Sequence, residues 1–108
     1  MYASLSPEVR GPQMMRELSV SNAFVAALCK IEQTRLSYAF RQLKPLSNEE
    51  GLRLTQTLGR LIEIREAVAP LSIDLKNPAN ARLVLDAFEG QDAESVRKKI
   101  STLFEGEN

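Results

Sequence analysis

Carboxylate pairs are the side chains in this chain that come closest to a catalytic pattern. Glu49 with Glu50, and Glu63 with Glu66, are carboxylates at helical spacing, and two neighbouring carboxylates can act as general acid and base. The chain has no His, however, which removes the commonest general base and metal ligand. Glu49 and Glu50 are also explained by a helix start, where acidic side chains favour the helix dipole. We therefore expect no enzyme and no cofactor.

Cysteine usage and hydropathy limit the remaining classes. The only cysteine, Cys29, cannot form a disulfide within the chain, and one Cys without His cannot make a structural zinc site. No window approaches the roughly 18 apolar residues of a membrane span. Glu8 and Arg10 stand where a secretory signal would be apolar. These features predict a cytoplasmic protein without a metal site or a membrane partner.

Residues 22–41 carry the most informative pattern. They read as two short helices joined by a tight turn, with Ala26 in the first helix, Ile31 in the turn, and Leu36 and Ala39 in the second. Two helices that cross steeply need a small residue where their backbones approach, and apolar residues at the turn and on the inner face. This pattern is typical of a helix-turn-helix, whose second helix enters the major groove of DNA.

The rest of the chain also reads as helical. Within 108 residues we expect one all-α domain, a small bundle of about five helices. A flexible arm is predicted over residues 1–15, a helix-turn-helix core over 16–69, and a C-terminal helical extension over 70–108 that serves packing or dimerisation. The predicted helices span residues 22–30, 32–42, 48–68, 79–89 and 92–105. The third opens with a capping box formed by Ser47 and Glu50.

Helical spacing of the apolar residues predicts which side chains face the core. The expected inward set is Phe24, Val25, Leu28, Cys29, Leu36, Ala39, Phe40, Leu43, Leu52, Leu54, Leu58, Leu61, Ile62, Ile64, Leu83, Val84, Ala87, Phe88, Val96, Ile100, Leu103 and Phe104.

Charge is balanced overall but unevenly distributed. The chain has 14 basic and 14 acidic side chains, which disfavours nonspecific, charge-driven binding of nucleic acid. Residues 21–60 nevertheless carry six basic and three acidic residues, whereas residues 67–108 carry five basic and seven acidic residues. The helix-turn-helix segment is therefore the locally basic one, although a difference of this size also arises by chance.

Residues 20–62 resemble the Cro and lambda-repressor-like (Xre-type) family of helix-turn-helix regulators. The matching features are Ala26, Ile31, the Leu36-Ser37 pair, the KPLS loop at Lys44–Ser47 and the sequence EEGLRLTQTLG at Glu49–Gly59. The family usually has Gly at the position of Lys30, because the backbone there favours positive φ. The resemblance covers about the middle 45 residues.

The resemblance implies a sequence-specific, double-stranded-DNA-binding transcriptional regulator, a homodimer that represses a phage, plasmid or its own promoter. It assigns base reading to exposed residues near the start of the second helix, and phosphate contact to residues around them. Gln33 would pair with adenine, Arg35 with guanine, and Thr34 would touch a thymine methyl. The implied base readers are Gln33, Thr34, Arg35, Ser37 and Tyr38, and the implied phosphate contacts are Asn22, Lys30, Arg41 and Lys44.

Two alternatives remain at the level of sequence. The polar residues of the second helix can be an ordinary solvated face, as can Arg97, Lys98 and Lys99 near the C-terminus. The whole chain can also be a helical interaction module, such as an antitoxin or adaptor subunit, that reuses the fold to bind a protein partner. An apolar groove between the C-terminal helices would favour this second function.

Overall fold

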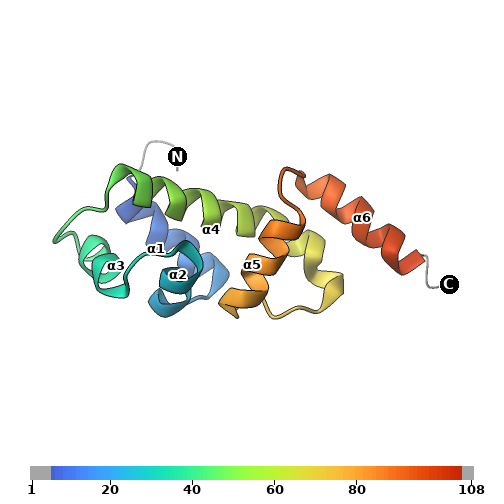
Figure 1. The fold of residues 1–108 in the computed structure, drawn as a ribbon, viewed down its shortest axis with the longest axis horizontal. Helices are drawn as coiled ribbons and strands as arrows, with labels where there is room; N and C mark the ends of the chain where they lie inside the picture. Colours follow the sequence, from blue (N-terminus) through green and yellow to red (C-terminus); the bar gives the residue numbers. More distant parts are fainter. Residues whose placement is uncertain (1–5, 106–108) are drawn as a thin grey trace.

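The computed structural model describes residues 6–105, and the all-α prediction is confirmed for them. Figure 1 shows the helices α1 (Pro7–Leu18), α2 (Asn22–Cys29), α3 (Gln33–Phe40), α4 (Asn48–Val68), α5 (Pro78–Ala87) and α6 (Ala93–Glu105), with a short 3₁₀ turn, η2 (Ala69–Leu71), after α4. Within residues 6–105 no helix is both long enough and apolar enough to cross a membrane.

Polar side chains fix where several of these helices begin. The hydroxyl of Ser21 accepts a hydrogen bond from the N–H of Phe24, which caps α2. The predicted capping box of α4 is present: Ser47 Oγ accepts from the N–H of Glu50 at 3.1 Å, and Glu50 Oε1 accepts from the N–H of Ser47 at 3.0 Å. Asp92 accepts from the N–H of Ser95 at 2.7 Å just before α6. Each cap satisfies an N–H that the helix itself leaves unpaired.

Helix α1 corrects the sequence prediction of a flexible arm over residues 1–15. Residues 7–15 belong to α1, and residues 1–5 lie outside the described part of the chain. Pro7, Gly11 and Pro12 suggested an irregular segment, but Pro7 lies in the first turn, where its missing N–H costs nothing. A Cβ on Gly11 would lie 2.8 Å from Phe40, so the glycine lets α1 approach α3 closely. Tertiary packing here outweighs low local helix propensity.

Helix α4 is the longest of the described helices and runs along the long axis of the molecule (Figure 1). Helices α1 and α2 pack against α4, and α3 packs against α1 and α2. Helix α5 packs against α2 and α4, and α6 packs along the second half of α4. The described chain measures 55 × 26 × 21 Å, and its radius of gyration of 15.0 Å exceeds the roughly 13 Å typical of a compact domain of this length. Helices α3 and α6 consequently lie at opposite ends of an elongated molecule.

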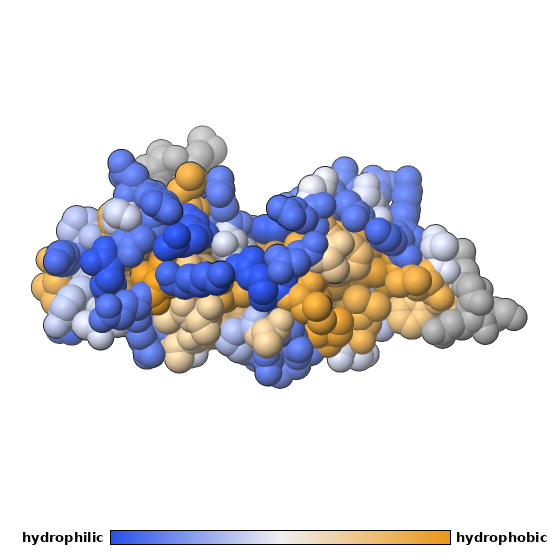
Figure 2. All heavy atoms as spheres, viewed as in Figure 1, coloured by the Kyte–Doolittle hydropathy of each residue, from blue (hydrophilic) through white to orange (hydrophobic). Residues whose placement is uncertain are grey.

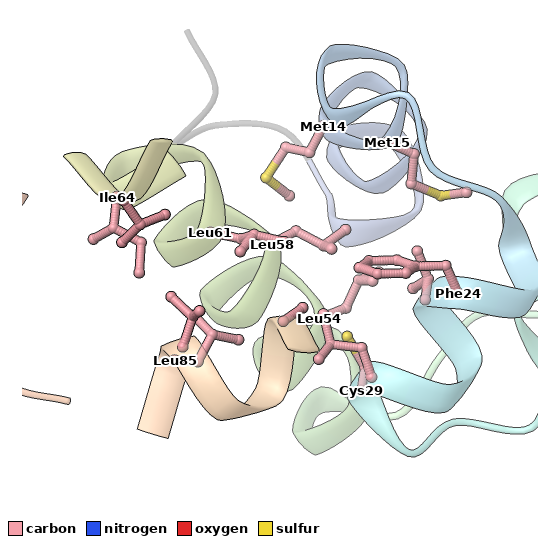
Figure 3. Close-up of a cluster of buried hydrophobic side chains, with 14 of the residues drawn as sticks. Met14, Met15, Phe24, Cys29, Leu54, Leu58, Leu61, Ile64 and Leu85 are labelled. Atoms are coloured by element: carbon pink, nitrogen blue, oxygen red, sulfur yellow. The ribbon is translucent and has the colours of Figure 1, made fainter. Parts of the chain in front are cut away.

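The core follows α4 through both halves. Figure 3 shows Leu54, Leu58 and Leu61 of α4 among side chains from three other helices: Met14 and Met15 from α1, Phe24 and Cys29 from α2, and Leu85 from α5. Val96 and Ile100 of α6 are buried in the same contiguous cluster. The first and second halves of α4 therefore share one core.

Six residues predicted to face inward are exposed instead: Leu43, Leu52, Leu83, Ala87, Leu103 and Phe104. Leu43 follows the end of α3 and lies in the loop before α4. Leu103 and Phe104 continue the stripe of Val96 and Ile100, but the stripe extends further along α6 than the surface that covers it. Helical period identifies a face, whereas burial also depends on a partner for each turn of that face.

Candidate functional site

Helices α2 and α3, which the sequence predicts to form a helix-turn-helix, lie at one end of the molecule (Figure 1). Helices α2 and α3 are joined by Lys30, Ile31 and Glu32, and Ile31 is buried and donates its N–H to the carbonyl of Ala26 at 3.2 Å. Lys30 has φ 57°, the left-handed conformation that the resemblance led us to expect at this position. Leu36 and Ala39 are buried on the inner face of α3, as predicted.

The outer face of α3 is polar and open to solvent. At about 100° per residue, Thr34, Tyr38 and Arg41 lie close together on the side opposite Leu36. Thr34 and Arg41 are exposed, and Tyr38 is 44% exposed. Gln33, the first residue of the helix, is exposed as well. Gln33, Thr34, Tyr38 and Arg41 therefore extend from the first residue of α3 to the residue that follows its end.

A hollow of about 600 Å³ lies where α1, α2 and α3 meet. It brings together three of the residues that the resemblance assigns to DNA, namely Asn22, Ser37 and Arg41. The other lining residues are Pro12, Met15, Arg16, Ser19, Val20 and Phe40. Arg16 and Arg41 are exposed, and neither pairs with a carboxylate within residues 6–105. The hollow therefore combines two free cations with the first turn of α2, where the helix dipole also favours an anion.

Sequence reasoning missed Arg16 as a member of this group. The predicted boundary of the helical core lay at this residue, so nothing tied its position to that of Arg41. Its place follows from α1 being a helix that packs beside α3. The only sequence signal was a basic residue in the last turn of a helix that local propensity did not favour.

Arg35 differs from the other predicted base readers because it is paired within the protein. Its Nε donates to Glu50 Oε2 at 2.9 Å, and its Nη2 donates to Glu50 Oε1, so the guanidinium makes two parallel bonds to one carboxylate. The Arg35 side chain is 39% exposed and that of Glu50 17%. This contact occupies the Nε–Nη2 edge of the guanidinium, which is one of its two edges that can pair bidentately with guanine.

Glu50 has a strongly perturbed acidity. The Arg35 guanidinium, together with the N–H of Ser47, lowers the pKa of the Glu50 carboxyl from its ordinary 4.5 to about 2. Hydrogen bonds and a neighbouring cation both stabilise the charged form of a carboxyl group. At neutral pH, Glu50 is therefore a carboxylate that joins α3 to the start of α4.

The remaining predicted phosphate contacts lie around the same end. Lys44 and Pro45, in the loop before α4, border a second hollow of about 180 Å³ with Glu32, Thr34, Arg35 and Tyr38. Lys30, in the turn, has an exposed side chain that lines neither of these two hollows. Its carbonyl accepts a hydrogen bond from Nη2 of Arg53 at 3.3 Å. The structure thus groups Asn22, Ser37 and Arg41 on one edge of α3, and Thr34, Tyr38 and Lys44 on the other.

The part of the chain that the structure describes contains neither a cluster of metal ligands nor a reactive thiol. Residues 6–105 contain no cluster of three His, Cys, Asp or Glu side chains that could hold a metal ion. Cys29 is buried in the core, where desolvation raises its pKa to about 11. A thiol with so high a pKa is a poor nucleophile at neutral pH.

Comparison of this chain with protein-family models, curated proteins and solved structures finds no match.

Proposed function

We propose that this protein is a sequence-specific DNA-binding transcriptional regulator that inserts α3 into the major groove. The observation that carries the proposal is the combination at one end of the molecule: a helix-turn-helix whose second helix is polar outside and apolar inside, bordered by unpaired cations. A helix in the major groove reads base edges with exposed side chains near its N-terminus. Gln33, Thr34 and Tyr38 have that position and exposure.

Phosphate contacts are proposed on both edges of α3. Arg16, Asn22 and Arg41 border the larger hollow, and Lys44 borders the smaller one. Cations on both sides of a reading helix match the two phosphate backbones that flank a groove, and such contacts fix the register of the protein on the duplex. The overall net charge of zero is compatible with this arrangement, because the acidic excess lies in residues 67–108.

We further propose that two copies act together on an inverted repeat. A single module of this size buries little DNA surface, and pairing two modules across two half-sites supplies the missing affinity. The mechanism would be occlusion of a promoter by the bound dimer.

The phosphate contacts provide a direct test. Arg16→Ala and Arg41→Ala are expected to weaken binding to all duplexes by a similar factor, and each should reduce the slope of log affinity against log salt by about one. Fluorescence anisotropy at several salt concentrations measures both quantities. Arg97→Ala, in α6 at the opposite end of the molecule, is the matched control. Equal salt slopes for wild type, Arg16→Ala and Arg41→Ala would refute the proposed contacts.

One observation favours the alternative of a protein-interaction module. Figure 2 shows apolar residues gathered over the half of the molecule that contains α5 and α6, where Leu83, Leu103 and Phe104 are all more than 40% exposed. Large exposed apolar groups gathered in one region often mark a binding surface. The two functions separate experimentally: a pure interaction module loses nothing when Gln33, Thr34 and Tyr38 are replaced by Ala, whereas a DNA reader loses sequence selectivity.

A further inference from the structure

The side chain of Arg35 leaves α3 in a different direction from those of its neighbours Thr34 and Tyr38. Thr34 and Tyr38 project from the outer face, whereas Arg35 lies on the flank that faces the start of α4. There the Nε and Nη2 donors, which form one edge of its guanidinium, meet the two oxygens of Glu50. Glu50 is held in turn by the capping box with Ser47, so its carboxylate has three hydrogen bonds from two elements.

We propose that Arg35 is a positioning residue of the DNA interface rather than a base reader: through Glu50 it fixes the angle between α3 and α4 and neutralises a carboxylate beside the reading helix. This inference rests on the proposed function. Base reading is then left to Gln33, Thr34 and Tyr38, the exposed residues of α3 without a partner of this kind.

The charge of Glu50 determines how loss of Arg35 would change the binding of DNA. Without Arg35, Glu50 would keep an uncompensated negative charge beside the hollow that Arg35 lines together with Glu32, Thr34 and Lys44. An uncompensated carboxylate at this place would repel the phosphates of any duplex, whatever its base sequence. A base reader behaves differently, because its removal relaxes the preference at one base pair.

The substitution Glu50→Gln separates repulsion of the DNA by an uncompensated carboxylate from the loss of a base contact. Glu50→Gln removes the charge but keeps the capping box, since Gln can occupy this position of the box as well as Glu. In the double variant Arg35→Ala/Glu50→Gln the stray carboxylate is therefore absent and the start of α4 is still capped. Arg35→Lys retains the positive charge but loses the two parallel bonds.

The experiment selects bound duplexes from a random pool with wild type, Arg35→Ala, Arg35→Lys and the double variant, and then measures affinities by anisotropy. We expect Arg35→Ala to bind all duplexes about fivefold more weakly with unchanged base preferences, and the double variant to recover most of that loss. Arg35→Lys is expected to bind all duplexes more weakly than wild type with unchanged base preferences, and this comparison with wild type tests the inference even if the alanine variant does not fold.

Three outcomes would overturn the inference. Relaxed preference at a single base pair in Arg35→Ala makes Arg35 a base reader, and a double variant that binds no better than Arg35→Ala shows that the uncompensated charge of Glu50 does not cause the loss of affinity. Unchanged affinity in Arg35→Ala shows that it contributes nothing to the interface. If wild type itself selects no sequence, the proposed function fails together with this inference, and the wild-type arm alone reveals that case.

Discussion

At the scale of single residues, exposure and pairing divide the side chains of α3 into separate roles. Gln33 and Thr34 are free to meet a ligand, Leu36 and Ala39 hold the helix to the core, and Arg35 is bonded to Glu50. The sequence alone places all five within seven positions and cannot separate a free arginine from a paired one. That distinction depends on Glu50, which lies 15 residues away and reaches Arg35 only when α4 folds back.

Gln33 is expected to discriminate one base pair. Gln33→Ala removes an amide that can pair with two edges of adenine, so we expect it to lose about 1–3 kcal/mol of discrimination at one position of the site. Competition anisotropy with duplexes that differ at single positions measures this loss. Gln56→Ala, on α4 and away from α3, is the matched control. A loss of affinity spread equally over all positions would contradict the assignment.

Glu50 is expected to make stability depend on acidic pH. Its folded pKa of about 2 lies below the ordinary 4.5, so its contribution to stability is present above about pH 4.5 and is lost as pH falls toward 2. Because Arg35 borders solvent, we expect the loss to be only about 1 kcal/mol. Urea denaturation at several values from about pH 6 to about pH 2 compares the stability of wild type with that of Glu50→Gln.

The glutamine variant should lack this part of the pH dependence, while Glu66→Gln controls for removing a carboxylate from the same helix. Parallel stability curves for wild type and Glu50→Gln would show that the ion pair with Arg35 contributes nothing.

At the scale of helices, local signals located α4 accurately and missed α1. The capping box of Ser47 and Glu50 and the proline at position 70 predicted residues 48–68, which are the bounds of α4. For α1 the local signals pointed the other way, because Gly11 and Pro12 both lower helix propensity. What stabilises α1 is contact with α3 and α4, and a single sequence does not contain that information. The hollow with Arg16 was missed for the same reason.

Two helical glycines should respond oppositely to alanine. A Cβ on Gly11 would lie 2.8 Å from Phe40 and 3.1 Å from Leu54, whereas a Cβ on Gly59 would meet nothing within 4 Å. Gly11→Ala is expected to destabilise the protein by about 1 kcal/mol, since overpacking exceeds the gain in helix propensity. Gly59→Ala is expected to stabilise it by about 0.5–1 kcal/mol.

Urea denaturation of the two variants side by side measures both changes. Equal stabilisation by the two substitutions would mean that α1 does not approach Phe40 and Leu54 as closely as described.

At the scale of the whole molecule, one core runs along α4 although α3 and α6 lie at opposite ends (Figure 1). Arg60 strengthens the second half by donating to the carbonyls of Phe88 and Gln91, which lie between α5 and α6. A contiguous core predicts that both ends unfold together. The C-terminal helices are then part of the same folding unit as the helix-turn-helix, whatever surface they offer to a partner.

Ile100→Ala tests whether the two ends of the molecule unfold together. Ile100 is 2% exposed, so its truncation should cost about 2–4 kcal/mol, whereas Leu103→Ala, at a position 59% exposed, should change little. The chain has no Trp and two Tyr, so in a Tyr2→Phe background Tyr38 reports on α3 alone. We expect the Tyr38 fluorescence and the circular dichroism of Ile100→Ala to shift to lower urea together. A Tyr38 transition left at its wild-type midpoint would show that the two ends unfold separately.

The proposed reading of DNA by α3 is tested most directly by selecting bound duplexes from a random pool with the wild-type protein and with the Gln33→Ala/Thr34→Ala/Tyr38→Ala variant. We predict that the wild type selects an inverted repeat and that the triple variant, which leaves the buried face of α3 unchanged, stays folded by circular dichroism but selects no sequence. Recovery of the same motif by both proteins, or of no motif by the wild type, would contradict the proposal that α3 reads DNA.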